Sequence, residues 1–211
     1  MQILYHKSID STQKYLKKLI EEKKVLPPYA VVADSQTDGI GSRGNSWIGV
    51  KDNLFLSFAI SLRELPQDLK LESSSIYFSY ILKETLEEFG SSVWLKWPND
   101  FYINDKKVGG MITNLVEETL ICGVGINIAD APSDFSKLDI ALDRDELIKS
   151  YFRNIEKKSL WKQVFSKYEI EFCKNQNFYT HDKDLQVSLR DALLQSDGSI
   201  VINGERIYSL R

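Results

Sequence analysis

The pattern of apolar and polar positions predicts a run of strands before residue 130. Residues Leu54 to Leu62 carry an apolar side chain at every second position, as in a strand with one buried face. Turn residues at Asn104-Asp105 and Glu117-Glu118 separate later strands from one another. Further strands are expected at Tyr29 to Ala33, Ser92 to Lys96, Phe101 to Ile103, Lys107 to Val116 and Thr119 to Ile128.

Helical spacing of apolar residues predicts four helices. The first has an apolar stripe from Tyr15 to Ile20 and ends before Pro27-Pro28. Asp10 and Gln13 have the spacing of a capping box at its start. The other helices are expected at Ser73 to Phe89, Arg144 to Ile155 and Leu160 to Phe172. Because runs of strands are separate from runs of helices, the pattern favours an α+β fold over a doubly wound sheet.

The composition changes after Asn175, which indicates a domain boundary. Short apolar segments from Leu185 to Leu210 flank Asp197-Gly198 and Asn203-Gly204, and both dipeptides are strong β-hairpin signals. A segment of about thirty residues cannot form a large core of its own. We therefore predict a main domain at residues 1–175 and a small β module at residues 176–211 that docks on it.

Composition and charge exclude several classes of protein. The chain has 211 residues and a net charge of −3, and it shows no stripe of Lys and Arg, so nucleic-acid binding is not expected. No apolar run approaches the roughly 20 residues of a membrane helix, and the N-terminus lacks the layout of a signal peptide. Cys122 and Cys173 have no metal or redox spacing. We expect a cytoplasmic protein that does not contact a membrane.

The segment Lys96-Trp97-Pro98-Asn99-Asp100 is the most informative feature of the sequence. Pro98 cannot donate to a sheet ladder and keeps the residue before it extended, so the apolar strand should end here. Lys96 is thereby expected at the last position of a strand, where burial of an ammonium is costly unless an anion meets it. In the alternative interpretation, its stem is buried and its ammonium reaches water.

A glycine-rich loop from Gln36 to Trp47 lies between two predicted strands. Its three glycines allow backbone amides to approach a ligand closely and to form an anion-binding nest. The loop is neither a Walker loop nor a dinucleotide fingerprint, because the lysine and the strand–helix context of those motifs are missing. A plain surface loop is the alternative. Trp47 argues against it, because a tryptophan at a loop end usually packs on something, and an aromatic base is one candidate.

Further candidates lie on the predicted strands and at the start of the first helix. Gly109-Gly110 and the segment from Gly123 to Asn127 indicate a bulge, a close approach of a ligand or tight sheet packing. Ser11 and Thr12 either cap the helix or point their hydroxyl groups at a polar ligand. The two histidines lack partners at useful spacing, so neither a nucleophilic triad nor a metal site is expected.

In this order, the segments resemble those of the biotin–protein ligase family. The tail from Ala192 to Leu210 is similar to the family's small C-terminal domain. The resemblance implies a class II synthetase-like catalytic domain, with a mixed or antiparallel sheet flanked by helices, and a C-terminal SH3-like β module. It also implies a short form without an N-terminal DNA-binding domain. The matching pieces are Asp10-Ser11-Thr12, Gln36 with the loop from Gly39 to Trp47, Lys96 to Asp100, Lys107 to Gly110, and Gly123 to Asn127.

The resemblance implies a two-step, ATP-dependent reaction. The carboxylate of biotin attacks the α-phosphate of ATP and forms biotinyl-AMP, and a lysine of a biotin carboxyl carrier protein then attacks the mixed anhydride. Mg²⁺ is expected on the ATP phosphates, and a homodimer is compatible with the resemblance. Because two anions must meet, a cation is needed between them. At about 4 Å and an effective dielectric constant of about 20, one such contact is worth about 4 kcal/mol before desolvation.

Site residues follow from the resemblance, position by position. Catalytic roles fall to Lys96, which would touch the carboxylate and the α-phosphate, and to Arg43. No metal-binding residue is expected. Biotin would contact Ser11, Thr12, Gln36, Gly39, Lys96 and Gly110. The nucleotide would contact Gly41, Arg43, Trp47, Asn99, Lys107 and Asn127.

The glycine loop departs from the family in one respect. Family members commonly have a Gly-Arg-Gly-Arg pattern, whereas this chain has Ile40 and Ser42 at those positions and Asn45 at a later basic one, so Arg43 remains. We hypothesise that this loop holds the adenylate less tightly than usual. Two rival functions stay open: a lipoate or octanoate ligase or transferase of the same fold, and a non-catalytic binder of biotin or nucleotide.

Overall fold

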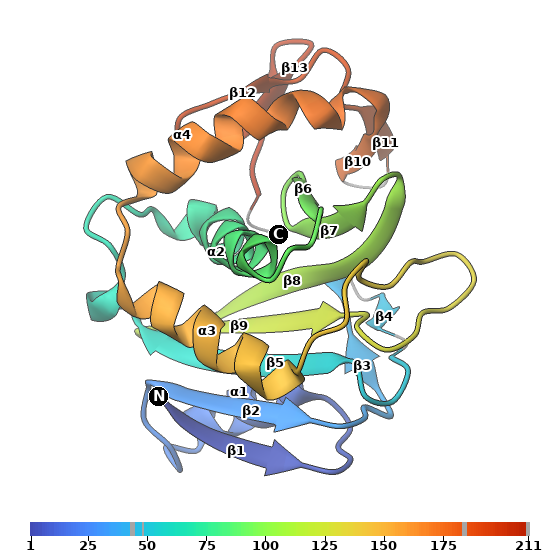
Figure 1. The fold of residues 1–211 in the computed structure, drawn as a ribbon. Helices are drawn as coiled ribbons and strands as arrows, with labels where there is room; N and C mark the ends of the chain where they lie inside the picture. Colours follow the sequence, from blue (N-terminus) through green and yellow to red (C-terminus); the bar gives the residue numbers. More distant parts are fainter. Residues whose placement is uncertain (43–44, 48, 183–184, 210–211) are drawn as a thin grey trace.

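A seven-stranded mixed sheet forms the centre of the molecule. Figure 1 shows the computed structural model, which describes residues 1–42, 45–47, 49–182 and 185–209. Strands β1 and β2 are parallel, and the other neighbouring pairs are antiparallel. The strands follow the order β1 (Gln2–His6), β2 (Tyr29–Ala33), β5 (Leu54–Ser61), β9 (Thr119–Ile126), β8 (Lys106–Val116), β7 (Asp100–Ile103) and β6 (Trp94–Lys96).

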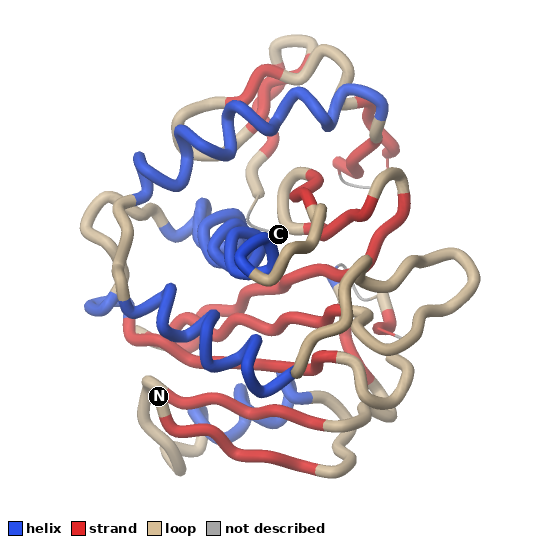
Figure 2. Tube along the Cα trace, in the orientation of Figure 1, coloured by secondary structure: helices blue, strands red, loops and turns tan. Residues whose placement is uncertain are grey.

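Helices lie on both faces of the sheet. In Figure 1, α2 (Ser74–Glu88) and α3 (Arg144–Glu156) lie in front of it and α1 (Thr12–Glu21) lies behind. We call these the α2 face and the α1 face. Figure 2 shows the same layers by type of element. Helix α4 (Trp161–Glu171) packs on α2, and short 3₁₀ turns occur at Leu62–Glu64, Leu71–Ser73 and Phe172–Asn177. In the part of the chain that is described, no helix has the length and apolar character of a membrane span.

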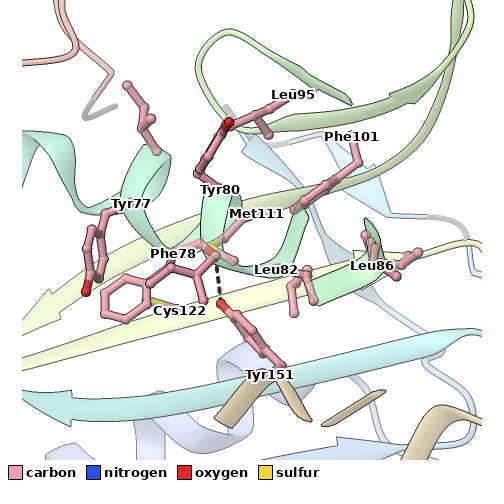
Figure 3. Close-up of a cluster of buried hydrophobic side chains, with 14 of the residues drawn as sticks. Tyr77, Phe78, Tyr80, Leu82, Leu86, Leu95, Phe101, Met111, Cys122 and Tyr151 are labelled. Carbon is pink, nitrogen blue, oxygen red and sulfur yellow. Dashed lines mark hydrogen bonds between the residues drawn. The ribbon is translucent and has the colours of Figure 1, made fainter. Parts of the chain in front are cut away.

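The larger hydrophobic core lies between the sheet and helices α2 and α3 (Figure 3). Phe58 of β5 packs edge-on against Phe78 of α2 and Tyr151 of α3, with ring centroids 5.5 and 5.7 Å apart. The Tyr151 hydroxyl donates to the Phe78 carbonyl oxygen at 2.9 Å, which is the dashed line in Figure 3. The buried hydroxyl is therefore paired, as a buried polar group needs to be. A smaller core, which includes Leu16 and Ile121, lies under α1.

The C-terminal strands form two small sheets that dock on the main core. Trp97 donates from Nε1 to the Gly198 carbonyl oxygen at 2.8 Å, and Ile200 and Ile207 belong to the larger core. The residues at the Asn203-Gly204 turn have φ of 52° and 83°, as expected for the predicted hairpin. One sheet pairs β10 (Tyr179–Asp182) with β11 (Leu185–Ser188), and the other contains β12 (Leu193–Leu194), β13 (Ile200–Ile202) and β14 (Glu205–Ile207). The division at residue 175 stays a prediction.

Most predicted elements are present, and three differences have physical reasons. No element was expected at β1, an edge strand that forms by pairing with β2. The glycine-rich loop contains a short hairpin, β3 (Gly39–Ile40) with β4 (Ser46–Trp47). The capping box was wrong: the N-cap is Ser11, whose Oγ accepts from the Lys14 amide, while the Gln13 side chain turns to the sheet.

Candidate active site

Two adjoining cavities lie at the end of the sheet where the β3–β4 hairpin packs. The first is on the α1 face, between the start of α1, the hairpin and the central strands. The second adjoins it near β6 and β10 and has a volume of about 540 Å³, within the size range of small-molecule sites. The two cavities share part of their lining, so we treat them as one site. The shared residues are Ile40, Gly41, Ser42, Asp100, Lys107 and Ile112.

One row of paired residues runs across the sheet through this site. Its members, from β5 to β6, are Phe55, Gly125, Gly110, Asp100 and Lys96. Directly paired residues point to the same face, so all five belong to the α1 face. The two glycines have no side chain and leave a trough in the sheet surface. The row therefore places an ammonium and a carboxylate at one end of a trough whose floor is backbone.

Lys96 is the last residue of β6, as predicted, and its side chain is largely buried. The side chain is 11% exposed, and its Nζ lies 3.6 Å from Asp100 Oδ2. The Nζ also lies 5.6 Å from the centroid of the Tyr102 ring. Burial raises the pKa of Tyr102 and the Asp100 carboxylate adds to this, so the ring beside Lys96 is a neutral phenol. Lys96 thus lines the second cavity with most of its side chain buried.

A β-bulge turns Lys107 toward the same carboxylate. Phe101 pairs with Gly109, but Tyr102 pairs with Lys107, so Val108 is passed over. Without this shift, Lys107 and Gly110 would point to opposite faces of the sheet, because successive side chains alternate. With the shift, Lys107 Nζ lies 2.5 Å from Asp100 Oδ1. A bulge was one of the interpretations of the Gly109-Gly110 pair.

Asp100 is shared between the two lysines. Burial alone would raise the pKa of its carboxyl, but the ammonium groups of Lys107 and Lys96 outweigh burial and hold this pKa below its usual value. Asp100 is therefore ionised at neutral pH. Two ammonium groups and one carboxylate leave an excess of positive charge at this end of the site, which favours anionic ligands.

The neighbouring row of the α1 face, Ser57, Gly123 and Ile112, meets the start of α1. Thr12 Oγ1 lies 2.9 Å from Ser57 Oγ and donates to Gln36 Oε1 at 3.1 Å. The Thr12 backbone amide donates to the same Gln36 oxygen at 2.7 Å. Ser11, the helix N-cap, also lines the first cavity. The result is a buried cluster of hydroxyl and amide groups that can pair with a polar, uncharged ligand.

The glycines of β9 make room for side chains of the cavity wall. A Cβ at Gly123 would lie 2.4 Å from Gln13 Oε1, and a Cβ at Gly125 would lie 2.6 Å from the nearest atom of the Trp47 indole. Tight packing is thus the interpretation that the structure bears out for both. The first cavity has a volume of about 50 Å³, with the indole over Gly125, so a larger ligand requires the hairpin to move.

The hairpin uses some of its own amides. Gly41 donates its backbone N–H to the Asn45 carbonyl oxygen at 2.7 Å, so this amide does not take part in the expected anion nest. Gly39 is not among the described residues that line the cavities, but a Cβ there would lie 2.6 Å from the Trp47 carbonyl oxygen. Arg43, to which catalytic and nucleotide-binding roles were assigned, lies outside the described residues, as does Gly44.

The two predicted asparagines differ in their environment. Asn99 lines the second cavity and donates from Nδ2 to the Met111 carbonyl oxygen. Asn127 is 1% exposed, and its amide holds the loop after β9 through Asn53 (3.2 Å) and the Ser136 carbonyl oxygen (3.1 Å). Asn127 is not among the described residues that line either of the two cavities. Its amide is thus used within the protein, and its contact with the nucleotide stays a prediction.

Gln13, Ser57 and Asp100 are among the lining residues to which no role at the site was assigned from the sequence. Ser57 is a polar residue between the apolar residues of β5, and Asp100 follows Lys96 by four positions, so the sequence contained a signal for both. Gln13 donates from Nε2 to Asn114 Oδ1 at 2.9 Å, while its buried Oε1 has no hydrogen-bond partner among the described residues. That oxygen can accept a hydrogen bond from a ligand.

The described residues do not fit a resident metal ion. No group of three or more His, Cys, Asp or Glu side chains in this part of the chain could hold one. The carboxylate that lines the cavity, Asp100, already has each oxygen near a lysine ammonium. A magnesium ion would therefore be held by phosphate groups and water, as Mg²⁺ commonly is.

A family model described as the biotin/lipoate A/B protein ligase family matches residues 5–128. The chain is 34% identical over 128 residues to the bifunctional ligase/repressor BirA of Escherichia coli. The matched region covers 57% of this chain and 39% of that protein. It is 33% identical to the protein of the same name from Bacillus subtilis, with 63% and 42% covered. The chain thus spans about two fifths of the length of these curated relatives.

Two solved structures are similar to this protein over nearly the whole length of the chain. A biotin acetyl coenzyme A carboxylase synthetase from Helicobacter pylori with bound biotinylated ATP has a TM-score of 0.94 and 38% identity, and covers 98% of this chain and 99% of that one. A biotin protein ligase from Aquifex aeolicus in complex with biotin and ATP has a TM-score of 0.78 and 25% identity, with 100% and 96% covered.

Proposed function

Because the chain belongs to the biotin/lipoate A/B protein ligase family, we propose that it activates biotin with ATP and transfers it to a lysine of a biotin carboxyl carrier protein. The observation that carries the proposal is the position of Lys96, Asp100 and Lys107 at the end of the glycine trough. Two ammonium groups beside a cavity suit a reaction in which two anions must meet. These substrates are supported by the Helicobacter structure, which has biotinylated ATP bound, and by the Aquifex structure, which is a complex with biotin and ATP.

In the first step, a carboxylate oxygen of biotin attacks the α-phosphorus of ATP. The bond from that phosphorus to the oxygen bridging to the β-phosphate breaks, and pyrophosphate leaves. Lys96 is assigned to the carboxylate and the α-phosphate, where its charge offsets their repulsion and the charge that develops in the transition state. Lys107 is assigned to the phosphates, and Mg²⁺ would arrive with the nucleotide.

In the second step, the neutral amine of the acceptor lysine attacks the acyl carbon of biotinyl-AMP. An amide bond forms, the bond to the phosphate oxygen breaks, AMP leaves, and the amine releases a proton to solvent. In this step, the part of the site residues would be to hold the adenylate in place.

The polar cluster at the start of α1 is assigned to the ureido ring of biotin. A ureido group has two N–H donors and one carbonyl acceptor, and each needs a partner when buried. The hydroxyl groups of Ser11 and Thr12 and the amide of Gln36 can both donate and accept, and Gln13 Oε1 can accept. This supports a ligand with a polar head over a purely aliphatic acid.

The nucleotide is assigned to the side of the site formed by the β3–β4 hairpin and the second cavity. Gly41, Trp47, Asn99 and Lys107 line this region. Trp47 offers an aromatic surface to adenine. Arg43 keeps its predicted catalytic and nucleotide-binding roles.

The test is incubation with ATP, biotin and a biotin carrier domain, followed by mass measurement of the carrier. A mass increase of one biotinyl group at one lysine, dependent on ATP, is expected. A carrier of unchanged mass, together with no pyrophosphate release, would contradict the proposal. Carrier left unmodified while biotin still binds would favour the non-catalytic binder.

The alternative substrate is lipoate or octanoate, because the description of the matching family names lipoate beside biotin. The same protein is mixed with ATP and each acid in turn, and pyrophosphate release is measured. Biotin should give the fastest release, because the hydroxyl and amide cluster has no partner on an aliphatic chain. Faster release with lipoate would reassign the substrate.

A further inference from the structure

Asp100 contacts both lysines of the site, and no role was assigned to it from the sequence. Its oxygens are divided between them, with Oδ1 2.5 Å from Lys107 Nζ and Oδ2 3.6 Å from Lys96 Nζ. The side chains of Asp100, Lys107 and Lys96 are 22%, 27% and 11% exposed. These ion pairs are shielded from water, so they hold geometry better than surface pairs do.

Three backbone features converge on this carboxylate. Lys96 and Asp100 are direct partners across β6 and β7, and the bulge between β7 and β8 turns Lys107 to the same face. Gly110 is the partner of Asp100 on β8. A Cβ at Gly110 would lie 3.2 Å from Asp100 Oδ1 and 3.4 Å from Lys107 Nζ, so glycine leaves space for the pair. The fold places one carboxylate between two ammonium groups.

The carboxylate solves a physical problem of this site. Two ammonium groups near one another repel. Because each lysine side chain has several rotatable bonds, each ammonium can move away from the other. An anion between them offsets the repulsion and sets where each ammonium lies. Precise placement matters for rate, since a displacement of about 1 Å can cost about 100-fold.

We propose that Asp100 is a positioning residue for the adenylation step, which holds Lys96 and Lys107 so that both ammonium groups act together on the biotin carboxylate and the ATP phosphates. This inference rests on the proposed function above. Asp100 itself makes and breaks no bond, because an anion at the reacting centre would repel both substrates. Asp100 affects the rate only through the positions of the two lysine ammonium groups.

The variant Asp100→Asn separates positioning from charge. It removes one negative charge from the cavity while both lysines remain, so the site becomes more positive. ATP should therefore bind as tightly as before or more tightly, whereas kcat for pyrophosphate release should fall about 10- to 100-fold because the ammonium groups are no longer held. A residue that merely stabilises the fold would change neither quantity at temperatures where the variant is folded.

The pH profile gives a second readout. In Asp100→Asn two ammonium groups face each other without an anion, so the state in which both are charged becomes less favourable. The alkaline limb of the kcat profile should move to lower pH accordingly. The described ionisable groups that face Asp100 or line the second cavity with it are Lys96, Tyr102, Lys107, Tyr179 and His181.

The experiment measures biotin-dependent pyrophosphate release from pH 6 to 10 and ATP binding by calorimetry, for wild type, Asp100→Asn and Asp100→Glu. Asp197→Asn is the matched control: its carboxylate lies 2.7 Å from Arg206 Nη2 and also has a lowered pKa, but it is not among the described residues that line the cavities. Asp197→Asn should leave kcat and the pH profile unchanged. Asp100→Glu should recover part of kcat.

Two outcomes overturn the inference: kcat of Asp100→Asn within twofold of wild type, or ATP affinity that falls in parallel with kcat. If Asp100→Asn does not fold, Gly110→Ala replaces it, because a Cβ there presses on the ion pair while every charge is retained. It should lower kcat without a change in net charge, and an unchanged kcat would contradict the inference. Failure of the proposed function looks different: wild type then releases no pyrophosphate at all, and the inference falls with it.

Discussion

The two faces of the central sheet are built by the same strands, with opposite chemistry. On the α2 face, Phe58, Cys122 and Met111 are buried in the core formed with helices α2 and α3, and Figure 3 shows Cys122 and Met111 there. Their neighbours in the chain, Ser57, Gly123 and Gly110, point to the α1 face and line the cavities. Because side chains alternate along a strand, one face can carry the larger core while the other face, where it lines the site, has few large side chains. The site is therefore a part of the sheet surface from which side chains have been left out.

Two buried lysines make the same contrast in charge. Lys83 of α2 is 7% exposed and lies 2.8 Å from Glu87 and 3.1 Å from Glu171, so two carboxylates surround one ammonium. At the site the ratio is reversed, because Lys96 and Lys107 share Asp100. The network around Lys83 is neutralised within the protein. The network around Asp100 retains positive charge, which is what a site for anions requires.

The largest effect is expected from Lys96→Ala. It removes the ammonium that would meet the carboxylate and the α-phosphate, so adenylation should fall by about 10³-fold or more, from about 4 kcal/mol of lost interaction. The melting temperature should stay near that of wild type. Pyrophosphate release measured beside circular dichroism checks both statements, and near-normal release would contradict the assigned role.

Lys83→Ala is the matched control for the buried lysine. It leaves the Glu171 carboxylate, itself 7% exposed, with the half-exposed Lys174 as a remaining partner at 2.8 Å, so the free energy of unfolding should fall by about 1–3 kcal/mol. Adenylation per folded molecule should not change. Loss of activity in folded Lys83→Ala would break the division between the two networks.

Phe58→Ala tests the packed face. Phe58 is 0% exposed and contacts the rings of Phe78, Tyr151 and Phe152, so truncation should lower the free energy of unfolding by about 3–5 kcal/mol. Ser57→Ala, one residue earlier on the other face, should cost about 1 kcal/mol, the value of one hydrogen bond, and should weaken biotin binding. Urea denaturation of both variants gives the comparison, and equal destabilisation would contradict it.

Ser42→Arg tests the hypothesis about the glycine loop. Ser42 lines both cavities at a position where family members commonly have arginine. An added guanidinium near the adenylate should slow its dissociation about tenfold, the value of one charge-assisted hydrogen bond. Dissociation of biotinyl-AMP and labelling of unrelated lysines are the measurements. Retention by wild type that already equals that of the variant would refute the hypothesis.

The smallest effect concerns Asp197 and acid stability. Burial raises the pKa of this carboxyl, but hydrogen bonds from Ser199 and the Arg206 guanidinium outweigh it, so the folded pKa is below the unfolded one. The stability from Asp197 is therefore present above its unfolded pKa, near 4, and is lost as the pH falls through the lower folded pKa. Asp197→Asn should make the unfolding free energy less dependent on pH between about 5 and 2. An unchanged slope would contradict this.

Local patterns in the sequence were sufficient for most of the elements. The alternation from Leu54 onward, Pro98 after a strand, and the Asn203-Gly204 turn act over a few residues, so they predicted strand, strand end and hairpin correctly. Local patterns did not predict an element or contact that depends on a residue far away in the sequence. Strand β1 exists because β2 pairs with it, and Gln13 leaves the helix cap because Asn114 and the Ile121 carbonyl oxygen take its amide.

The sequence by itself determined that Lys96 ends a strand, that small residues interrupt apolar strands, and that the segments occur in the order of one enzyme family. The tertiary structure decided how these features meet. The bulge that passes over Val108 brings Lys107 to Asp100, and the register of β6, β7 and β8 sets Lys96, Asp100 and Gly110 in one row. The physical reason is the range of the interactions. Backbone preference and alternation act between neighbours in the chain, whereas pairing and charge act between residues that come together when the sheet forms.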